Sequence, residues 1–316
     1  MTPVIIDCDP GHDDMIAIML AASDPNIDLI GVTTVAGNQT GAKTFQNALK
    51  VLTLIGETNL PVARGADVPL FRELTVAPEI HGVSGLDGAA LPEPEVIARD
   101  IHAVDLIGNL VDNSTQKVTL VPTGPLTNIA LSFLKNPRIK QNIERIVLMG
   151  GALFDSNITP AAEFNIYVDP EAADIVFRSG LPITMVGLDA TNKALVGFED
   201  IDRLEDFGGP VSGVVAPLLR FFAGANRDIF GFNGAPVHDA LAVASVAQPE
   251  VISTQHLHVA IETDGSLTRG RTVADVYKVT GKKPNVNVAM DLDLPLFLEM
   301  VFTAMKNLDE RTGKTG

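Results

Sequence analysis

The chain has 316 residues, of which 46% are apolar, and its 23 Lys and Arg against 39 Asp and Glu give a formal charge of -16. This charge disfavours binding to nucleic acid or anionic lipid, and the single cysteine, Cys8, excludes a disulfide framework and any multi-cysteine metal site. Because neither a signal peptide nor a membrane helix is indicated, we expect a cytoplasmic protein that contacts no membrane and binds a small molecule.

Short β-branched runs alternate with longer helical patterns from the first residues onward. The expected strands are Pro3–Asp7, Ile27–Val35, Lys117–Pro122, Arg145–Met149 and Ile183–Gly187. The expected helices between and after them are Asp13–Ala22, Ala42–Ile55, Leu126–Leu134 and Asp169–Arg178. This βαβα order predicts an α/β fold with an open, mostly parallel, doubly wound sheet.

The second part of the chain continues this pattern less regularly. It predicts helices at Val211–Phe222, Val237–Ala247 and Leu294–Lys306, and strands at Gln255–Ile261, Thr272–Lys278 and Val286–Met290. Two irregular stretches, Asp67–Glu95 and Phe222–Pro236, are typical of loops that cover a site. No linker or fixed-period repeat interrupts the chain, so residues 1–316 are expected to form a single domain.

Four carboxylates lie within eight residues where the first strand meets the first helix, in the run Asp7-Cys8-Asp9-Pro10-Gly11-His12-Asp13-Asp14. At about 4 Å and an effective dielectric near 20, each close pair of carboxylates costs about 4 kcal/mol. A solvated helix start would explain one or two of these aspartates, but not four. No Lys or Arg occurs between Met1 and Ala42, so the positive charge must come from a distant side chain or a metal ion. Oxygen ligands favour calcium or magnesium over zinc.

Polar turns follow other expected strands, and the carboxyl ends of parallel strands meet at one sheet edge. The turns in question are Thr123–Asn128, Met149–Gly151 and Asp189. His238-Asp239 begins an apolar helical pattern, either as a capping pair or as a metal ligand, Asp239, beside a proton-transfer group, His238. The run Glu163-Phe164-Asn165 is expected in a polar loop, where a carboxylate and an amide flanking an aromatic ring would suit a sugar.

These motifs, taken in order, resemble those of the inosine-uridine-preferring nucleoside hydrolase family over nearly the whole chain. The resemblance is carried by Asp7–Asp14, Gly37–Thr40, His81-Gly82, Pro122–Gly124, Met149–Gly151, Ala162–Asn165, Val186–Asp189 and Val237–Asp239. The stretches Ser84–Gly88, Leu91–Pro94, Gly234–Pro236 and Thr280–Asn285 look like those of bacterial pyrimidine-specific ribonucleoside hydrolases. The resemblance implies a Rossmann-like nucleoside hydrolase fold with extra loops and helices over the active site. It also implies an N-ribohydrolase that cuts the N-glycosidic bond of uridine and cytidine, in nucleoside salvage or catabolism.

The same resemblance implies roles for individual residues. One calcium ion per subunit would be held by Asp9, Asp14, Asp239 and the carbonyl oxygen of Thr123, and Asp9 would also be the base that activates water. Ribose contacts are implied for Asp13, Asn38, Met149, Asn157, Glu163 and Asn165. His81 and His238 would face the nucleobase, with His238 as the acid, and Asp7 would support the metal site. A homodimer or homotetramer is also implied.

Two departures from the family pattern concern the nucleobase. Thr191-Asn192 stands where relatives often have Thr-His, and the loop or helix before the His238-Asp239 pair holds no tyrosine, since only Tyr167 and Tyr277 exist. The base would then be covered by residues from the set Asn226, Arg227, Phe230 and Phe232. Three alternatives stay open: a broad or purine-accepting nucleoside hydrolase, a non-catalytic nucleoside- or ribose-binding protein, and a haloacid-dehalogenase-type phosphatase. The last expects Thr or Val at the position of Gly11.

Overall fold

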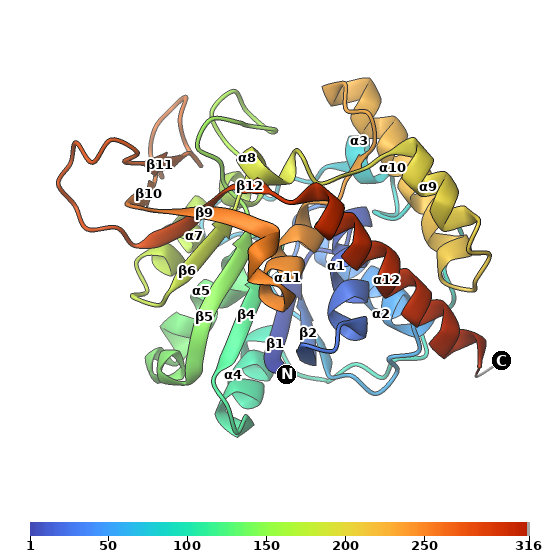
Figure 1. Cartoon of the computed structure of the whole chain (residues 1–316). Helices are drawn as coiled ribbons and strands as arrows, with labels where there is room; N and C mark the ends of the chain where they lie inside the picture. Colours follow the sequence, from blue (N-terminus) through green and yellow to red (C-terminus); the bar gives the residue numbers. More distant parts are fainter. Residues whose placement is uncertain (315–316) are drawn as a thin grey trace.

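A central eight-stranded sheet organises the computed structural model, which describes residues 1–314 (Figure 1). Its strands lie in the order β3 (Val62–Arg64), β2 (Ile27–Thr34), β1 (Thr2–Cys8), β4 (Val118–Pro122), β5 (Ile143–Met149), β6 (Ile183–Val186), β12 (Val286–Leu292) and β9 (Ile252–Leu257). Neighbouring strands are parallel, except that the edge strand β9 runs antiparallel to β12. The expected mostly parallel, doubly wound sheet is therefore confirmed.

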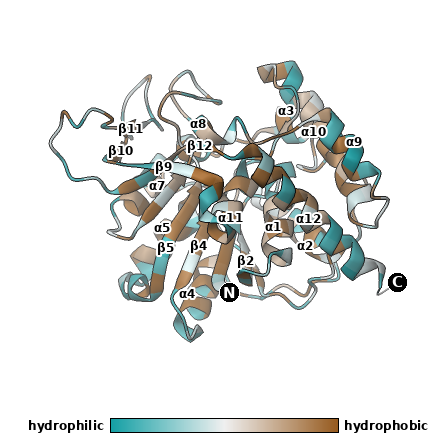
Figure 2. Ribbon diagram, viewed as in Figure 1, coloured by the Kyte–Doolittle hydropathy of each residue, from teal (hydrophilic) through white to brown (hydrophobic). Residues whose placement is uncertain are grey.

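Helices cover both faces of this sheet, because side chains alternate along each strand. On β1, Val4 and Ile6 belong to one apolar core, whereas Ile5 belongs to the other. The first core contains α1 (His12–Ser23), α2 (Gly41–Leu54), α9 (Phe198–Glu205), α10 (Ser212–Phe230), α11 (His238–Ala247) and α12 (Leu294–Gly313). The second contains α4 (Ala103–Asn113), α5 (Thr127–Lys135), η1 (Pro137–Asn142) and α7 (Pro170–Phe177). Figure 2 shows the resulting pattern, hydrophobic strands inside and hydrophilic outer faces on helices such as α9 and α12.

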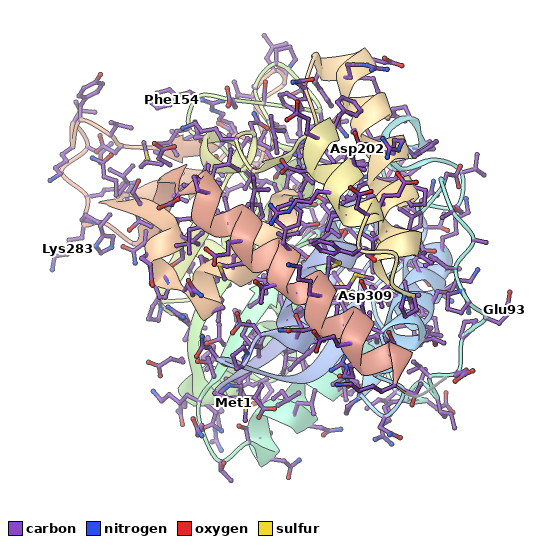
Figure 3. All side chains as sticks on the ribbon, turned by 45° about the vertical axis from the view of Figure 1, so that its right-hand side comes forward. Met1, Glu93, Phe154, Asp202, Lys283 and Asp309 are labelled. Atoms are coloured by element: carbon purple, nitrogen blue, oxygen red, sulfur yellow. The ribbon has the colours of Figure 1, made fainter. Side chains whose placement is uncertain are left out.

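Two helices of the first core, α1 and α11, are apolar on nearly all sides because they lie between the sheet and other helices. They pack against each other, so their first turns are close in space. A further helix of this layer, α10, begins where the Asp309 carboxylate on α12 accepts hydrogen bonds from the backbone N–H groups of Val211 at 2.7 Å and Ser212 at 3.0 Å (Figure 3).

Short elements complete the chain. They are α3 (Pro78–His81), α6 (Phe164–Val168), α8 (Leu188–Thr191), β7 (Leu195–Val196), β8 (Ala235–Pro236), η2 (Pro249–Val251), β10 (Val259–Ile261) and β11 (Thr272–Ala274). With the amino terminus at the bottom of Figure 1, α3, α8 and α10 lie at the top, toward which the carboxyl end of β1 points. Among residues 1–314, no helix is long and apolar enough to cross a membrane.

The expected helices and strands of the first part of the chain are confirmed to within a few residues. Three later expectations, one helix and two strands, are wrong in their bounds. The helix expected at Val211–Phe222 runs on as α10 to Phe230, so the stretch from Phe222 to Pro236 is irregular only in its second half. It continues because Phe222, Ala223 and Asn226 are buried on its inner side, and it ends at Gly231, whose φ of +76° is left-handed.

The strand expected at Gln255–Ile261 is divided into β9, which pairs with β12, and β10, which pairs with β11. The strand expected at Thr272–Lys278 stops at Ala274, where a turn begins. In that turn the Asp275 carboxylate accepts hydrogen bonds from the backbone N–H groups of Val279 and Thr280, both at 2.8 Å. The alternation of residues along the sequence predicts neither a change of pairing partner nor a turn stabilised by a side chain.

Candidate active site

Four buried aspartates meet at the carboxyl edge of the sheet. Asp9 follows β1, Asp13 and Asp14 lie in the first turn of α1, and Asp239 lies in the first turn of α11. One carboxylate oxygen from each of Asp13, Asp14 and Asp239 lies within 4.8 Å of the others. The packing of α1 on α11 thus joins two acidic motifs that lie more than 200 residues apart.

Asp9 lies beside these three carboxylates, against the backbone of two glycines. A Cβ atom at Gly37 would come within 2.1 Å of Asp9 Oδ2, and one at Gly124 within 2.5 Å of Oδ1. The backbone N–H of Asn38 donates a hydrogen bond of 2.6 Å to Oδ2. Oδ1 is buried and accepts no hydrogen bond within residues 1–314. Asp9 is therefore held by one oxygen and keeps the other free.

Asp14 and Thr123 connect the cluster to the rest of the site. Asp14 Oδ2 accepts hydrogen bonds from the backbone N–H of Gly11 at 3.0 Å and from Asn38 Nδ2 at 3.3 Å. The Thr123 hydroxyl donates to Asp14 Oδ1 at 2.8 Å, while the Thr123 carbonyl accepts a bond of 2.7 Å from Asn165 Nδ2. Thr123, at the end of β4, therefore contacts both the acidic cluster and Asn165.

The electrostatics of the cluster indicate a missing positive charge. Burial raises the pKa of Asp13 to about 7, and burial followed by repulsion from Asp14 holds the pKa of Asp9 well above its ordinary value. Burial and the neighbouring Asp13 act in the same direction on the pKa of Asp239. None of the ion pairs formed within residues 1–314 includes a cluster carboxylate. The unpartnered Asp9 Oδ1 and Asp13 Oδ1, in an all-oxygen donor set, fit a hard divalent cation.

A cavity of about 250 Å³ opens beside the cluster. Its walls contain every residue expected to contact ribose, namely Asp13, Asn38, Met149, Asn157, Glu163 and Asn165, together with Phe164, the aromatic ring of the run expected to suit a sugar. The prediction of a polar loop around Glu163 is wrong, because Glu163 caps the short buried helix α6. Its carboxylate accepts hydrogen bonds from the backbone N–H groups of Asn165 at 3.0 Å and Gly151 at 2.8 Å.

The buried position of Glu163 can be tested by measuring how the stability of the protein depends on pH. Burial raises its pKa to about 7 from an ordinary 4.5. A carboxyl group whose folded-state pKa is raised costs stability as pH rises from the unfolded value through the folded one. We expect the free energy of unfolding of wild type, relative to Glu163→Gln, to fall by about 3 kcal/mol between pH 4.5 and 8, because the amide cannot ionise. Urea unfolding of both proteins across this range measures it, and parallel profiles would show that Glu163 titrates normally.

Both expected histidines line the cavity. His238 Nδ1 lies 2.8 Å from the Thr191 hydroxyl, and burial lowers the pKa of His238 to about 4. His81 packs against the rings of His12 and Phe222, with centroid separations of 5.6 and 5.2 Å, and those two rings also stack on each other at 5.1 Å. Asn192, the second residue of the pair that departs from the family pattern, instead donates from Nδ2 to Asp155 at 3.0 Å.

The far wall of the cavity comes from α3 and α10, which pack together. Asn226 and Phe230 line it as expected, but Arg227 and Phe232 do not: Arg227 lies over the Phe198 ring. The sequence reasoning missed six lining residues, namely Ala77, Glu79, Ile80, Ile158, Phe222 and Ile229. No local pattern marks them, because α3 and α10 are far apart along the chain and become one wall only on folding.

Asp7 is set apart from the other aspartates. Alternate residues of an extended strand share a face, but Asp9 lies beyond the end of β1, so its side chain need not point with that of Asp7. Asp7 Oδ1 accepts hydrogen bonds from the hydroxyl of Thr33 on β2 at 2.6 Å and from Nδ2 of Asn128 on α5 at 2.8 Å. Burial still raises its pKa to about 6. Its contacts join β1, β2 and α5 beneath the site, which suits a supporting role.

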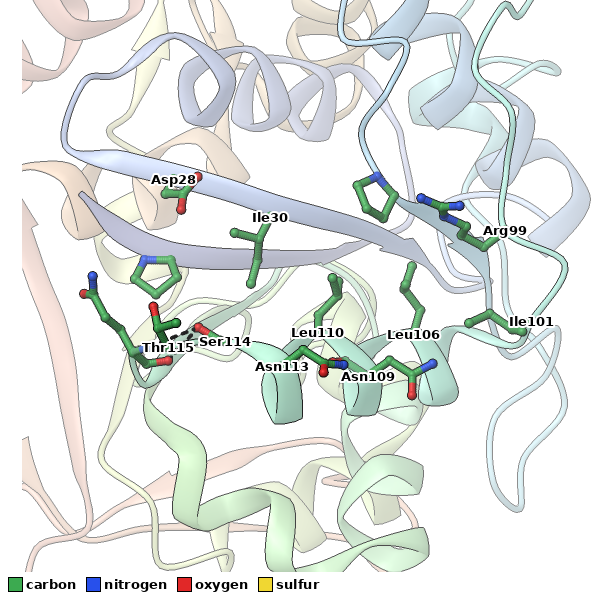
Figure 4. Close-up of a pocket in the computed structure, with 13 residues that line it drawn as sticks. Asp28, Ile30, Arg99, Ile101, Leu106, Asn109, Leu110, Asn113, Ser114 and Thr115 are labelled. Atoms are coloured by element: carbon green, nitrogen blue, oxygen red, sulfur yellow. Dashed lines mark hydrogen bonds between the residues drawn. The ribbon is translucent and has the colours of Figure 1, made fainter.

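A larger hollow, of about 510 Å³, lies between β2 and α4 near the amino ends of the strands (Figure 4). Ile30 of β2 points toward the helix that carries Leu110. None of the expected site residues lines this hollow. The residues that carry chemistry are concentrated at the opposite edge of the sheet.

Comparisons with known proteins agree with this geometry. Residues 4–299 match the sequence profile described as inosine-uridine preferring nucleoside hydrolase. The chain is 49% identical over 305 residues to the pyrimidine-specific ribonucleoside hydrolase RihA of Escherichia coli, covering 96% of this chain and 98% of that protein. It superposes on the purine-preferring ribonucleoside hydrolase from Gardnerella vaginalis with a TM-score of 0.92 and 35% identity, covering 98% and 99% of the two chains. For the plant nucleoside hydrolase PpNRh1, the TM-score is 0.89 and the identity 30%, with 96% and 98% covered.

Proposed function

Because this chain belongs to the inosine-uridine preferring nucleoside hydrolase family, we propose that, among the ribonucleosides whose N-glycosidic bond it hydrolyses, it prefers the pyrimidine nucleosides uridine and cytidine. The supporting observation is one cavity that joins an acidic cluster, a carboxylate and amides suited to ribose hydroxyls, and two histidines. The products are ribose and the free base.

Asp9 is proposed as the base that accepts a proton from the attacking water. Its buried Oδ1 has no hydrogen-bond partner within residues 1–314, while Asn38 holds Oδ2 in place. As the water oxygen bonds to C1′ and the C1′–N bond breaks, positive charge develops on the sugar. The neighbouring carboxylates favour that charge, and Asn165, Glu163 and Asn157 lie where they can orient the ribose hydroxyls.

We propose calcium as the metal of the acidic cluster, held by Asp9, Asp14, Asp239 and the carbonyl oxygen of Thr123. Asp13, expected to contact ribose, also offers an oxygen to this cluster, so it belongs to both environments. A bound calcium ion would offset the carboxylate charge and make a nearby water molecule easier to deprotonate. The all-oxygen donor set supports calcium over zinc, and magnesium is the alternative to test.

His238 is proposed to assist departure of the base. If the Thr191 hydroxyl donates to Nδ1, the ring proton lies on Nε2, the nitrogen left for a hydrogen bond to the departing base. We expect His238→Ala to slow ribose release from uridine about 10²-fold or more, but to affect 4-nitrophenyl riboside much less, since nitrophenolate leaves without a proton. Steady-state kinetics on both substrates measure this. An equal loss on both would argue against a hydrogen bond from His238 to the departing base.

The proposed function is tested by measuring ribose release from a panel of uridine, cytidine, inosine, adenosine and deoxyuridine, with and without a chelator. We expect pyrimidine ribonucleosides to be cleaved fastest and the chelator to stop turnover until calcium is returned. Faster cleavage of inosine or adenosine would instead identify a purine-accepting enzyme. The expected homodimer or homotetramer, the cytoplasmic location and the role in nucleoside salvage stay predictions.

A further inference from the structure

The part of the cavity that α3 and α10 line is unusual in its polar groups. Its wall is largely apolar, with Ile80, Phe222, Ile229 and Phe230 among the lining residues. No Lys or Arg within residues 1–314 lines any part of the cavity. Besides His81, two polar side chains stand out in the wall that α3 and α10 form, Glu79 on α3 and Asn226 on α10. These two residues are the candidates for reading the edge of the nucleobase.

The orientation of the Asn226 amide is fixed by its own helix. Its side chain is 2% exposed, and Nδ2 donates a hydrogen bond of 2.9 Å to the carbonyl oxygen of Phe222. Because a carbonyl oxygen can only accept, the nitrogen must face the helix backbone and the amide oxygen must face the other way. Oδ1 accepts no hydrogen bond from any group within residues 1–314. Asn226 therefore offers the cavity an unpartnered acceptor.

Glu79 adds a second acceptor to the same wall. It lies two residues before His81 on α3 and is exposed at the cavity mouth, where no ion pair or hydrogen bond within residues 1–314 engages its carboxylate. A carboxylate accepts hydrogen bonds and donates none. The wall formed by α3 and α10 thus presents acceptors from both helices and no positive charge.

We propose that Glu79 and Asn226 select nucleobases with an exocyclic amino group, so that cytidine is cleaved in preference to uridine. This inference rests on the proposed function, since it concerns which pyrimidine the same cavity takes. The amino group of cytosine carries two N–H donors, one for each acceptor. Uracil offers one N–H between two carbonyl oxygens, and a carbonyl oxygen facing the Glu79 carboxylate is repelled. A site built to bond a donor rejects a ligand that lacks it much more strongly than an apolar pocket rejects a change in size.

The experiment compares kcat/KM for cytidine and uridine in wild type, Glu79→Gln, Asn226→Leu and a control, Glu73→Gln. Glu73 is an exposed glutamate in the loop before α3 and lines neither the site cavity nor the hollow between β2 and α4. We expect wild type and the control to favour cytidine by about tenfold or more, which corresponds to a difference of about 1.4 kcal/mol. Glu79→Gln can donate to the uracil oxygen, so its ratio should fall to within about twofold of unity. Asn226→Leu should lower the ratio by weakening cytidine cleavage.

Three results would overturn the inference. A wild-type ratio near unity, or one in favour of uridine, with ribose released from both, would refute the amino-group selection and leave the proposed function intact. A high ratio that persists in both variants would place the selectivity elsewhere in the molecule. If wild type released ribose from neither pyrimidine nucleoside but did so from purine nucleosides, the proposed pyrimidine preference itself would fail, and this inference with it.

Discussion

Asp9→Asn is expected to slow ribose release by about 10³-fold or more while the protein stays folded. A general base contributes about 10²- to 10⁴-fold to the rate of a proton transfer, and an amide cannot take the proton. The asparagine oxygen can still accept the hydrogen bond that the backbone N–H of Asn38 gives to Asp9 Oδ2. The side chain keeps its volume, which the close backbones of Gly37 and Gly124 require.

The measurement is single-turnover ribose release with saturating uridine, next to circular dichroism and thermal melting of the same sample. Asp28→Asn is the matched control, because Asp28 is an exposed aspartate on β2 at the other end of the sheet. The control should keep full activity. Turnover of Asp9→Asn close to that of wild type, with calcium present, would remove Asp9 from the role of base.

Asp239→Asn is expected to have opposite effects on stability with and without metal. Carboxylate oxygens of Asp13, Asp14 and Asp239 lie within 4.8 Å of one another and repel when no cation is bound. At that separation and an effective dielectric near 20, a pair of charges costs about 3 kcal/mol, part of which protonation of the raised-pKa carboxyls relieves. Removing one charge should therefore raise the melting temperature in chelator by a few degrees.

With calcium the order should reverse. Wild type gains about 4 kcal/mol of stability when the free ion is about 1,000-fold above its dissociation constant, and the variant, lacking one ligand, gains much less. Ribose release by the variant should fall along with its affinity for calcium. Thermal melting in chelator and in millimolar calcium, with calcium titration by calorimetry, measures both effects. Asp112→Asn, at an exposed aspartate of α4, should melt like wild type in each condition. If Asp239→Asn gained as much stability from calcium as wild type, Asp239 would not be a ligand.

The prediction of fold and site succeeded wherever a signal was local in the sequence. β1 and α1 were predicted from the spacing of apolar residues along the sequence. The acidic run between them lies at the strand end because Pro10-Gly11 turns the chain there. The expected ribose-contacting residues line the cavity because the carboxyl ends of parallel strands share one edge. The length of α10 was missed because contacts between distant residues decide it, whereas the helix that Glu163 caps and the turn at Asp275 depend on side-chain hydrogen bonds to the nearby backbone that alternation does not reveal.

The sequence by itself determined the alternation of strands and helices and the run of four aspartates with no nearby Lys or Arg, which indicates a bound cation. These features depend on residues within a few positions of one another. Only the tertiary structure decided which carboxylates share a cation-sized space and which groups face the nucleobase. The pairing of Asp14 with Asp239 depends on the packing of α1 against α11, and the acceptor wall of Glu79 and Asn226 on that of α3 against α10. Such contacts are set by the burial of whole helix faces, which no short stretch of residues records.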